Sequence, residues 1–176
     1  QSKDSKMYDS TIATNEEVQS LCITIISTIK DNLITNEKVT TTSWTEFKLE
    51  LINEHDIREC KDGLAFIAAN FKSTAGDTTE PPKDDNHALK RTGANIDQYF
   101  ALVLDYDDGL SIAEAKNTFS DFEYIGYTTH NHLNPDIEKF RLVFLLEDPV
   151  THSTIWERKA AILKWAVSAD TSTLAN

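Results

Sequence analysis

The stretch YFALVLDYDDGLSIAEAKNTF, residues 99–119, predicts the centre of the fold. Tyr99–Asp105 is a nearly continuous apolar run that ends in an acidic residue, which is typical of a buried strand. Asp108 and Gly109 follow as turn-forming residues. Ser111–Glu114 has the Ser-x-x-Glu spacing of a capping box, which predicts a helix that continues to about Phe119. The segment therefore predicts a strand, a turn and a helix in direct succession.

The segments on either side predict further helices and strands by their periodicity and turn residues. We expect a helix from the capping box Thr14–Glu17 to about Leu33, a helix from the box Ser43–Glu46 to about Asn53, a strand over Gly63–Phe71, a long loop over 72–98, strands over Glu123–Thr129 and Phe140–Leu146 with Pro149 ending the latter, and a last helix from Ser153 to Val167. This order predicts an α+β fold: an antiparallel or mixed sheet flanked by helices, with an N-terminal helical segment. We expect a flexible N-terminus over 1–13 and a single domain over 14–176.

The composition excludes several classes of protein. The chain has 176 residues, of which 40% are hydrophobic, and a net charge of −12, which argues against bulk electrostatic attraction to nucleic acid. No segment has the length of an apolar membrane span or the core of a signal peptide, and Cys22 and Cys60 form neither a disulfide framework nor a zinc site. We expect a cytoplasmic protein without membrane contact. Because the chain begins with Gln1, we expect it to be a piece of a longer protein.

The acidic turn raises the first functional question. Asp105 and Asp107 are two residues apart on a strand, so both carboxylates lie on one face and Tyr106 on the other. Two close carboxylates repel unless they share a proton or a cation, and Mg²⁺ or Mn²⁺ takes oxygen ligands of this kind. The alternative is that all three aspartates only form the turn. An EF-hand is excluded because its glycine and closing glutamate positions are Leu110 and Lys116.

A second polar patch, YTTHNHLNP over residues 127–135, follows the next predicted strand. His130 and His132 could bind a metal as in His-x-His nucleases, one of them could contact a phosphate, or both could be surface loop residues. We expect this patch and the aspartates to lie on neighbouring strands at one edge of the sheet. Arg141 begins the following antiparallel strand, where it could reach a phosphate, and Asp170 is a candidate third carboxylate.

Taken in order, these residues resemble the archaeo-eukaryotic primase superfamily, especially phage and plasmid primase-polymerases. The matching stretches are LVLDYDDG, YIGYTTHNHLNPDIEKFRLVFLLEDPV and AVSADTSTLAN, which cover roughly residues 90–176. The resemblance implies an RNA-recognition-motif-like sheet fused to an α/β subdomain. The family's hydrophobic-Asp motif matches Ala169-Asp170, and its phosphate-binding histidine falls on His132, with His130 kept open. The family continues past Asn176 with another strand, so the resemblance also implies a C-terminal truncation.

The resemblance further implies two-metal nucleotidyl transfer with Mg²⁺ or Mn²⁺. Asp105, Asp107 and Asp170 would bind the two ions, and His132, aided by Arg141, would neutralise the phosphates of an NTP or dNTP. Lys90 and Arg91 would contact the template or the triphosphate. The implied activity is DNA primase or polymerase on a single-stranded DNA template during phage or plasmid replication, in the bacterial cytoplasm and with a fused or associated helicase.

Two other functions stay open from the residues alone. The first is a non-catalytic replication-initiation module that binds DNA without turnover. The second is a metal-dependent phosphatase or a His-x-His nuclease. Nucleotide incorporation, phosphate release or a tyrosyl–DNA adduct would distinguish them.

Overall fold

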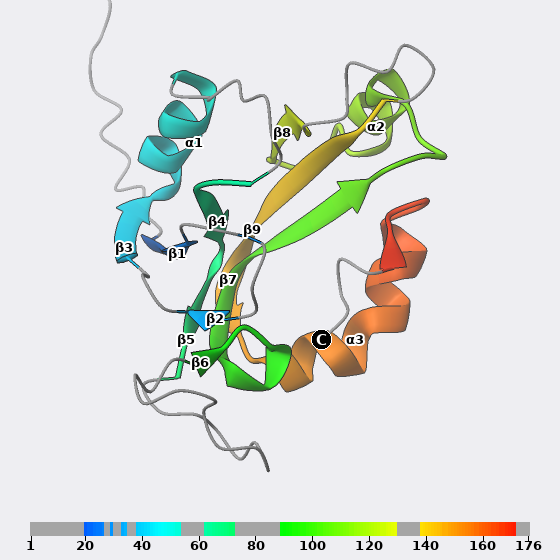
Figure 1. The fold of residues 1–176 in the computed structure, drawn as a ribbon. Coiled ribbons are helices and arrows are strands. Elements are labelled where there is room, and N and C mark those ends of the chain that lie inside the picture. Colours follow the sequence, from blue (N-terminus) through cyan, green and yellow to red (C-terminus); the bar gives the residue numbers. More distant parts are fainter. Residues whose placement is uncertain are drawn as a thin grey trace, which may run out of the picture.

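The computed structural model describes residues 20–26, 29, 33–34, 38–53, 62–72, 89–129 and 138–171 of the chain (Figure 1). The elements in chain order are β1 (Ser20–Ile26), β2 (Leu33–Ile34), β3 (Lys38–Ser43), α1 (Trp44–Asn53), β4 (Ala65–Ile67), β5 (Ala69–Phe71), β6 (Leu89–Lys90), the 3₁₀ turn η1 (Gly93–Asn95), β7 (Ile96–Tyr106), α2 (Ile112–Thr118), β8 (Ile125–Thr128), β9 (Phe140–Val150) and α3 (His152–Trp165). The fold is α+β, as the sequence predicts.

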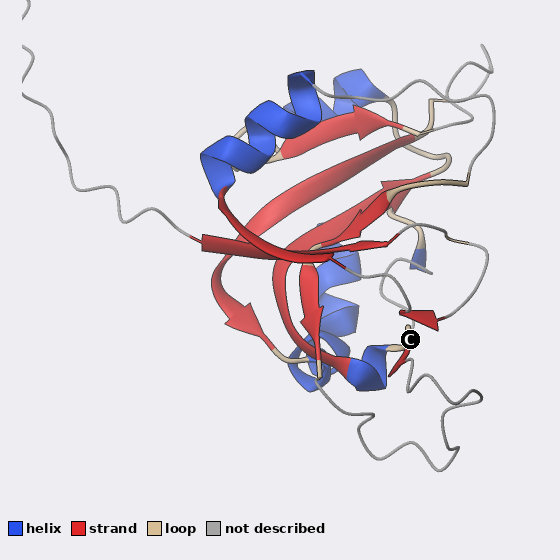
Figure 2. Ribbon diagram, turned by 60° about the vertical axis from the view of Figure 1, so that its left-hand side comes forward, coloured by secondary structure: helices blue, strands red, loops and turns tan. Residues whose placement is uncertain are grey.

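The strands form two larger sheets and one short ribbon. The first sheet has the order β3-β1-β4, the second β5-β7-β9-β8, and β2 pairs with β6. All these pairings are antiparallel. The sheets are strongly twisted and curled (Figure 2).

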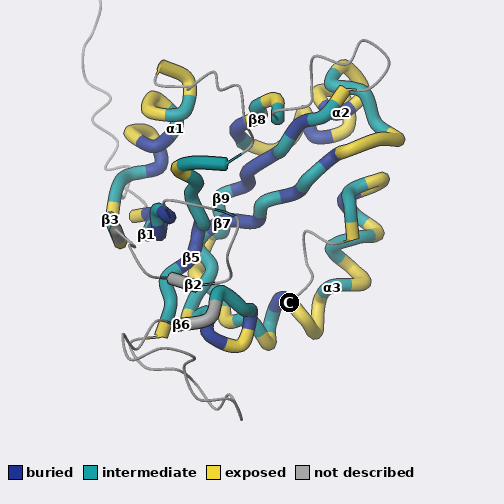
Figure 3. Tube along the Cα trace, in the orientation of Figure 1, coloured by how far each residue is buried: buried dark blue, intermediate teal, exposed yellow. Residues whose placement is uncertain are grey.

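The strand β7 is buried on both faces, which explains its nearly continuous apolar sequence. Leu102, Leu104 and Tyr106 belong to a core that also contains residues of α2 and α3. Ala101 and Val103 face the other way, into a core shared with β1 and α1. Accordingly, α2 and α3 lie on one side of β7 and β9, and α1 with β1 and β3 on the other (Figure 1). The middle of β7 is buried, whereas the acidic turn that follows it is exposed (Figure 3).

Two predicted capping boxes are confirmed. The Ser111 side chain accepts from the backbone N–H of Glu114, and the Glu114 carboxylate accepts from the backbone N–H of Ser111. Ser43 and Glu46 make the same reciprocal pair before α1. These contacts satisfy donors that a helix N-terminus leaves without intrahelical partners.

We expect this capping to depend on pH. Hydrogen bonds from the Ser111 backbone and side chain lower the pKa of Glu114, so the stabilisation is present above the ordinary glutamate pKa and is lost as pH falls through the lowered folded-state value. The Glu114→Ala variant should therefore be less stable than the wild type at neutral pH. That difference should shrink as pH falls below the ordinary glutamate pKa of about 4.3 and disappear once pH is below the lowered folded-state pKa. Urea unfolding over a pH series measures it, and Glu50→Ala, which removes an exposed glutamate inside α1, is the control. A constant difference across the series would contradict this account.

The helix predicted from residue 14 to about Leu33 is wrong, because residues 20–26 form β1, the central strand of its sheet. The run Ile23-Thr24-Ile25-Ile26 is β-branched throughout, which favours a strand. Both faces of β1 are covered, and the buried Thr24 hydroxyl donates to the Ala69 carbonyl at 2.8 Å. With both faces buried, the spacing of apolar residues does not distinguish a strand from a helix.

Three boundaries also differ from the prediction. The strand expected over Gly63–Phe71 is divided at Ala68 into β4 and β5, which belong to different sheets. The loop expected over 72–98 contains β6, η1 and the start of β7. The strand β9 continues through Pro149 to Val150, because its register with β7 shifts between Tyr99 and Ala101. Proline is tolerated in such an irregular stretch, where the ladder does not need its missing N–H.

Candidate functional site

The site is built on the sheet face opposite α2 and α3. Asp105 of β7 is opposite Arg141 of β9, which is in turn opposite Tyr127 of β8. The adjacent residues Tyr106 and Phe140 point into the core beside α2 and α3, so this row points to the other face. The strand β9 therefore lies between β7 and β8, and the expectation that the aspartate and histidine patches occupy neighbouring strands is wrong. Because β7 and β8 both pair antiparallel with β9, they run parallel to each other.

Each aspartate of the DxD pair contacts a basic residue at the start of β9 or just before it. The Arg141 guanidinium Nη2 donates to Asp105 Oδ2 at 2.7 Å. The Lys139 ammonium lies 3.1 Å from Asp107 Oδ1. Two carboxylates two residues apart at the end of β7 thus match two cations two residues apart at the start of β9, and each cation screens the repulsion between the carboxylates.

Tyr127 completes the row that Asp105 and Arg141 form across the sheet. Its side chain hydrogen-bonds Arg141, and its ring centroid lies 6.1 Å from that of Phe66 in β4. Burial raises the pKa of the Tyr127 phenol, which the nearby Arg141 offsets only in part. Burial disfavours the charged form of Arg141, but its hydrogen bond to Asp105 and the neighbouring charges outweigh this effect and raise the pKa of Arg141. At neutral pH the row therefore holds a neutral phenol and a permanently charged guanidinium.

The backbone of Asp170, the third predicted carboxylate residue, reaches this site through the turn after α3. The backbone N–H of Asp170 donates to the backbone carbonyl of Asp105 at 2.8 Å. Ser168 has a φ of +65° and Gly109 a φ of +77°, so two left-handed turns reverse the chain here. A Cβ on Gly109 would lie 3.3 Å from the Ser168 Cβ, so the two turns pack closely. The structure thus brings together the backbones of Asp105 and Asp170, which are 65 residues apart in sequence.

The carboxylates do not form a complete ligand set by themselves. Among the described residues, no three His, Cys, Asp or Glu side chains are grouped so that they could hold a metal ion. His130 and His132 lie outside the described residues. The described residues that flank them, Thr129 and Lys139, are joined by a backbone hydrogen bond of 3.0 Å. His130 therefore directly follows Thr129 in sequence, and the Thr129 backbone is bonded to Lys139, the ion-pair partner of Asp107.

The two basic residues predicted from the loop lie elsewhere. Arg91 donates through Nη2 to the Ile29 carbonyl at 3.2 Å. The backbone of Lys90 pairs with Leu33 in the β2–β6 ribbon, and its side chain lies outside the described part of the chain. Their predicted contact with template or triphosphate stays a prediction.

Sequence analysis missed Lys139 and Tyr127. A signal for Lys139 was present: Lys139 and Arg141 have the same two-residue spacing as Asp105 and Asp107, and antiparallel pairing of Asp105 with Arg141 places Lys139 beside Asp107. Tyr127 had no such signal, because its role depends on β9 lying between β8 and β7.

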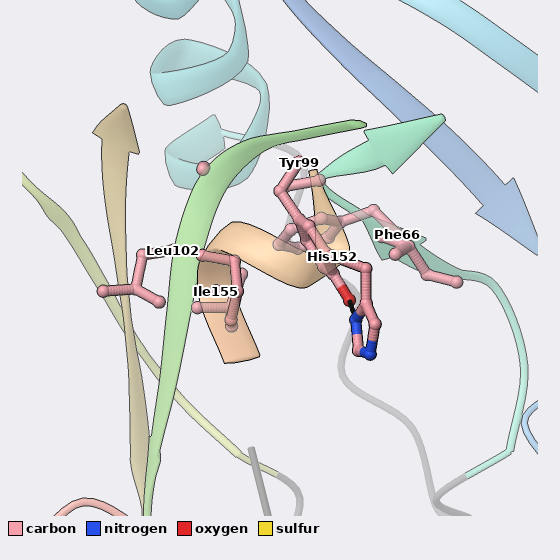
Figure 4. Close-up of a pocket in the computed structure, with 9 residues that line it drawn as sticks. Phe66, Tyr99, Leu102, His152 and Ile155 are labelled. Atoms are coloured by element: carbon pink, nitrogen blue, oxygen red, sulfur yellow. Dashed lines mark hydrogen bonds between the residues drawn. The ribbon is translucent and has the colours of Figure 1, made fainter. Parts of the chain in front are cut away.

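A cavity of about 180 Å³ lies at the other end of β7 (Figure 4). Phe66, Leu102 and Ile155 contribute apolar lining, and the Tyr99 hydroxyl lies 3.2 Å from His152 Nδ1. Its lining extends along β7 from Tyr99 to Val103, which is two residues before Asp105.

Comparisons with protein-family models, with curated proteins and with solved structures find no match for this chain. In the described part of the chain, no helix is both long enough and apolar enough to cross a bilayer.

Proposed function

We propose that this chain is a metal-dependent nucleotidyltransferase of the primase-polymerase type, which extends or initiates strands on a single-stranded DNA template in phage or plasmid replication. The observation that carries the proposal is the 2.8 Å hydrogen bond between the backbones of Asp170 and Asp105. Two sequence motifs, the DxD pair and the hydrophobic-Asp motif, suggested these two residues independently of any structure. Their contact through a chain reversal supports a common site.

The order of elements also supports the proposal. The segment β7-α2-β8-β9-α3 has the strand order β7-β9-β8, with both helices on one face. This is the split β-α-β arrangement expected of an RNA-recognition-motif-like sheet. The other face of that sheet carries Asp105, Arg141 and Tyr127 at one end, where a nucleotide could approach.

The donor chemistry of this face fits a divalent cation. Asp105 and Asp107 offer carboxylate oxygens on one face, the ligand type that Mg²⁺ and Mn²⁺ prefer. Each of the two carboxylates pairs with a cationic side chain, so both attract positive charge. Asp105 and Asp107 would hold the ion, and Asp170 would complete the set. When bound, the ion would activate a 3′-hydroxyl and neutralise charge on the leaving pyrophosphate.

The chain's own residues would act by binding and orientation. Arg141, fixed between Asp105 and Tyr127, keeps the Asp105 carboxylate in one orientation. His132 or His130, aided by Arg141, would bind the phosphates of the incoming nucleotide. Positioning and charge stabilisation account for most of the catalysis in phosphoryl transfer.

Primer extension tests the proposal. The chain is incubated with a labelled primer annealed to a DNA template, with dNTPs or NTPs and with Mn²⁺ or Mg²⁺. We expect the primer to lengthen with a divalent ion and to stay unchanged with EDTA. If the chain binds the template but does not extend the primer under any of these conditions, the proposal is wrong.

One observation favours a second function, a non-catalytic DNA-binding module with the same fold. Both DxD carboxylates are already paired with basic residues, and the described residues contain no three-ligand group. A sheet face neutralised in this way needs no metal. This alternative predicts DNA affinity that is independent of Mn²⁺.

A further inference from the structure

We propose that Lys139 competes with the divalent cation for Asp107, and that its ammonium, once displaced, binds the phosphates of the incoming nucleotide. This inference rests on the proposed function and names a regulating residue of the same site. It starts from the two ion pairs of the carboxylate face, which differ in the exposure of their carboxylates.

The Asp105–Arg141 pair is held firmly. The Asp105 side chain is only 20% exposed, and Arg141 also hydrogen-bonds Tyr127. The 2.7 Å bond is charge-assisted, and breaking it would leave two charges poorly solvated. Arg141 is therefore a fixed part of the site.

The Asp107–Lys139 pair can open. The Asp107 side chain is 49% exposed and the Lys139 side chain 23%, and no hydrogen bond within the described residues fixes the Lys139 ammonium in a second position. Water therefore reaches the Asp107 carboxylate, and surface ion pairs contribute only about 0.2–1 kcal/mol. The four-carbon stem of lysine lets the ammonium move several ångströms while the backbone stays in place.

Metal binding and displacement of Lys139 are therefore thermodynamically linked. A divalent ion on Asp107 gains a carboxylate ligand and repels a nearby ammonium. The displaced ammonium starts two residues in sequence from Arg141, so it adds a second positive charge where phosphates would bind. By reciprocity, polyphosphate that holds Lys139 away from Asp107 strengthens metal binding.

The test measures binding and not activity. Isothermal titration calorimetry gives the Kd of Mn²⁺ alone for the wild type, Lys139→Met and Lys139→Arg. The control is Lys48→Met, which breaks the Lys48–Glu123 ion pair elsewhere on the surface. We expect Lys139→Met to bind Mn²⁺ roughly three- to tenfold more tightly than the wild type. Lys139→Arg and Lys48→Met should stay within about twofold of it.

A second titration uses inorganic tripolyphosphate in the presence of saturating Mn²⁺. We expect Lys139→Met to bind it at least about threefold more weakly, because one cationic contact is missing. The two expected effects have opposite signs, because metal binding becomes tighter and polyphosphate binding weaker. A general loss of structure would weaken both. Circular dichroism confirms that each variant is folded.

The outcomes separate this inference from the proposed function. If Lys139→Met binds Mn²⁺ no more tightly than the wild type while both bind it measurably, the competition is wrong and the metal site stands. Unchanged tripolyphosphate binding in Lys139→Met would show that the displaced Lys139 ammonium does not bind phosphate. If neither the wild type nor Lys139→Met binds Mn²⁺, with or without tripolyphosphate, the inference and the metal-dependent function both fail.

Discussion

The Asp105→Asn, Asp107→Asn double variant should incorporate nucleotides at least about 100-fold more slowly than the wild type. Asparagine keeps the shape of each side chain but removes the negative charge that would hold a divalent ion. Under the proposed function, no other described group replaces both carboxylates, because Asp170 alone offers a single ligand. Incorporation is measured as the initial rate of primer extension with Mn²⁺.

The single variants separate catalysis from stability. Asp105→Asn removes the anionic partner of the partly buried Arg141 and should lower the free energy of unfolding by about 1–3 kcal/mol. Asp107→Asn breaks only the more exposed pair, so its stability should be close to that of the wild type. A large loss of activity in Asp107→Asn is therefore the cleaner result. Glu123→Gln, which removes the acidic partner of Lys48 and none of the residues of the proposed site, should keep full activity.

Full activity in Asp107→Asn would contradict the assignment of the DxD pair as metal ligands. An equal loss in Glu123→Gln would point to a non-specific effect of charge.

The largest expected effect on stability is that of Phe119→Ala, which should cost about 3–5 kcal/mol. Phe119 follows α2, is 1% exposed, and packs against Phe144 and Trp165 with ring centroids 5.3 and 5.2 Å away. Its removal leaves a cavity between β9 and α3. Since domains are stable by about 5–15 kcal/mol, this loss is a large share of the total. Urea unfolding measures it.

Phe122 provides a matched control for Phe119. Its ring contacts the same Phe144 and Trp165, at 6.4 and 5.2 Å, but the residue is 49% exposed. Phe122→Ala removes a similar volume without opening an internal cavity, so its cost should be clearly smaller. Equal costs for the two variants would show that the core between α2, β9 and α3 is not packed as described.

Local features of the sequence predicted the elements that depend on local contacts. The apolar run before Asp105 marks β7 because a strand covered on both faces needs apolar residues at successive positions. The boxes at Ser111 and Ser43 mark the starts of α2 and α1 because capping joins residues only three apart. The carboxylate pair was visible for the same reason, since the two-residue period of a strand places Asp105 and Asp107 on one face.

Long-range contacts decided the rest. Residues 20–26 became a strand because β3 and β4 pair with both edges of it, and local spacing contains no information on such partners. Lys139 faces Asp107 only because β9 pairs with β7 in one register, and a shift of one residue would turn both cations to the other face. Asp170 lies beside Asp105 because the turns at Ser168 and Gly109 pack together. Hydrogen bonding and burial between distant segments thus assemble the candidate site. Neighbouring residues suffice to specify the single strands, helix starts and carboxylate pair from which it is built.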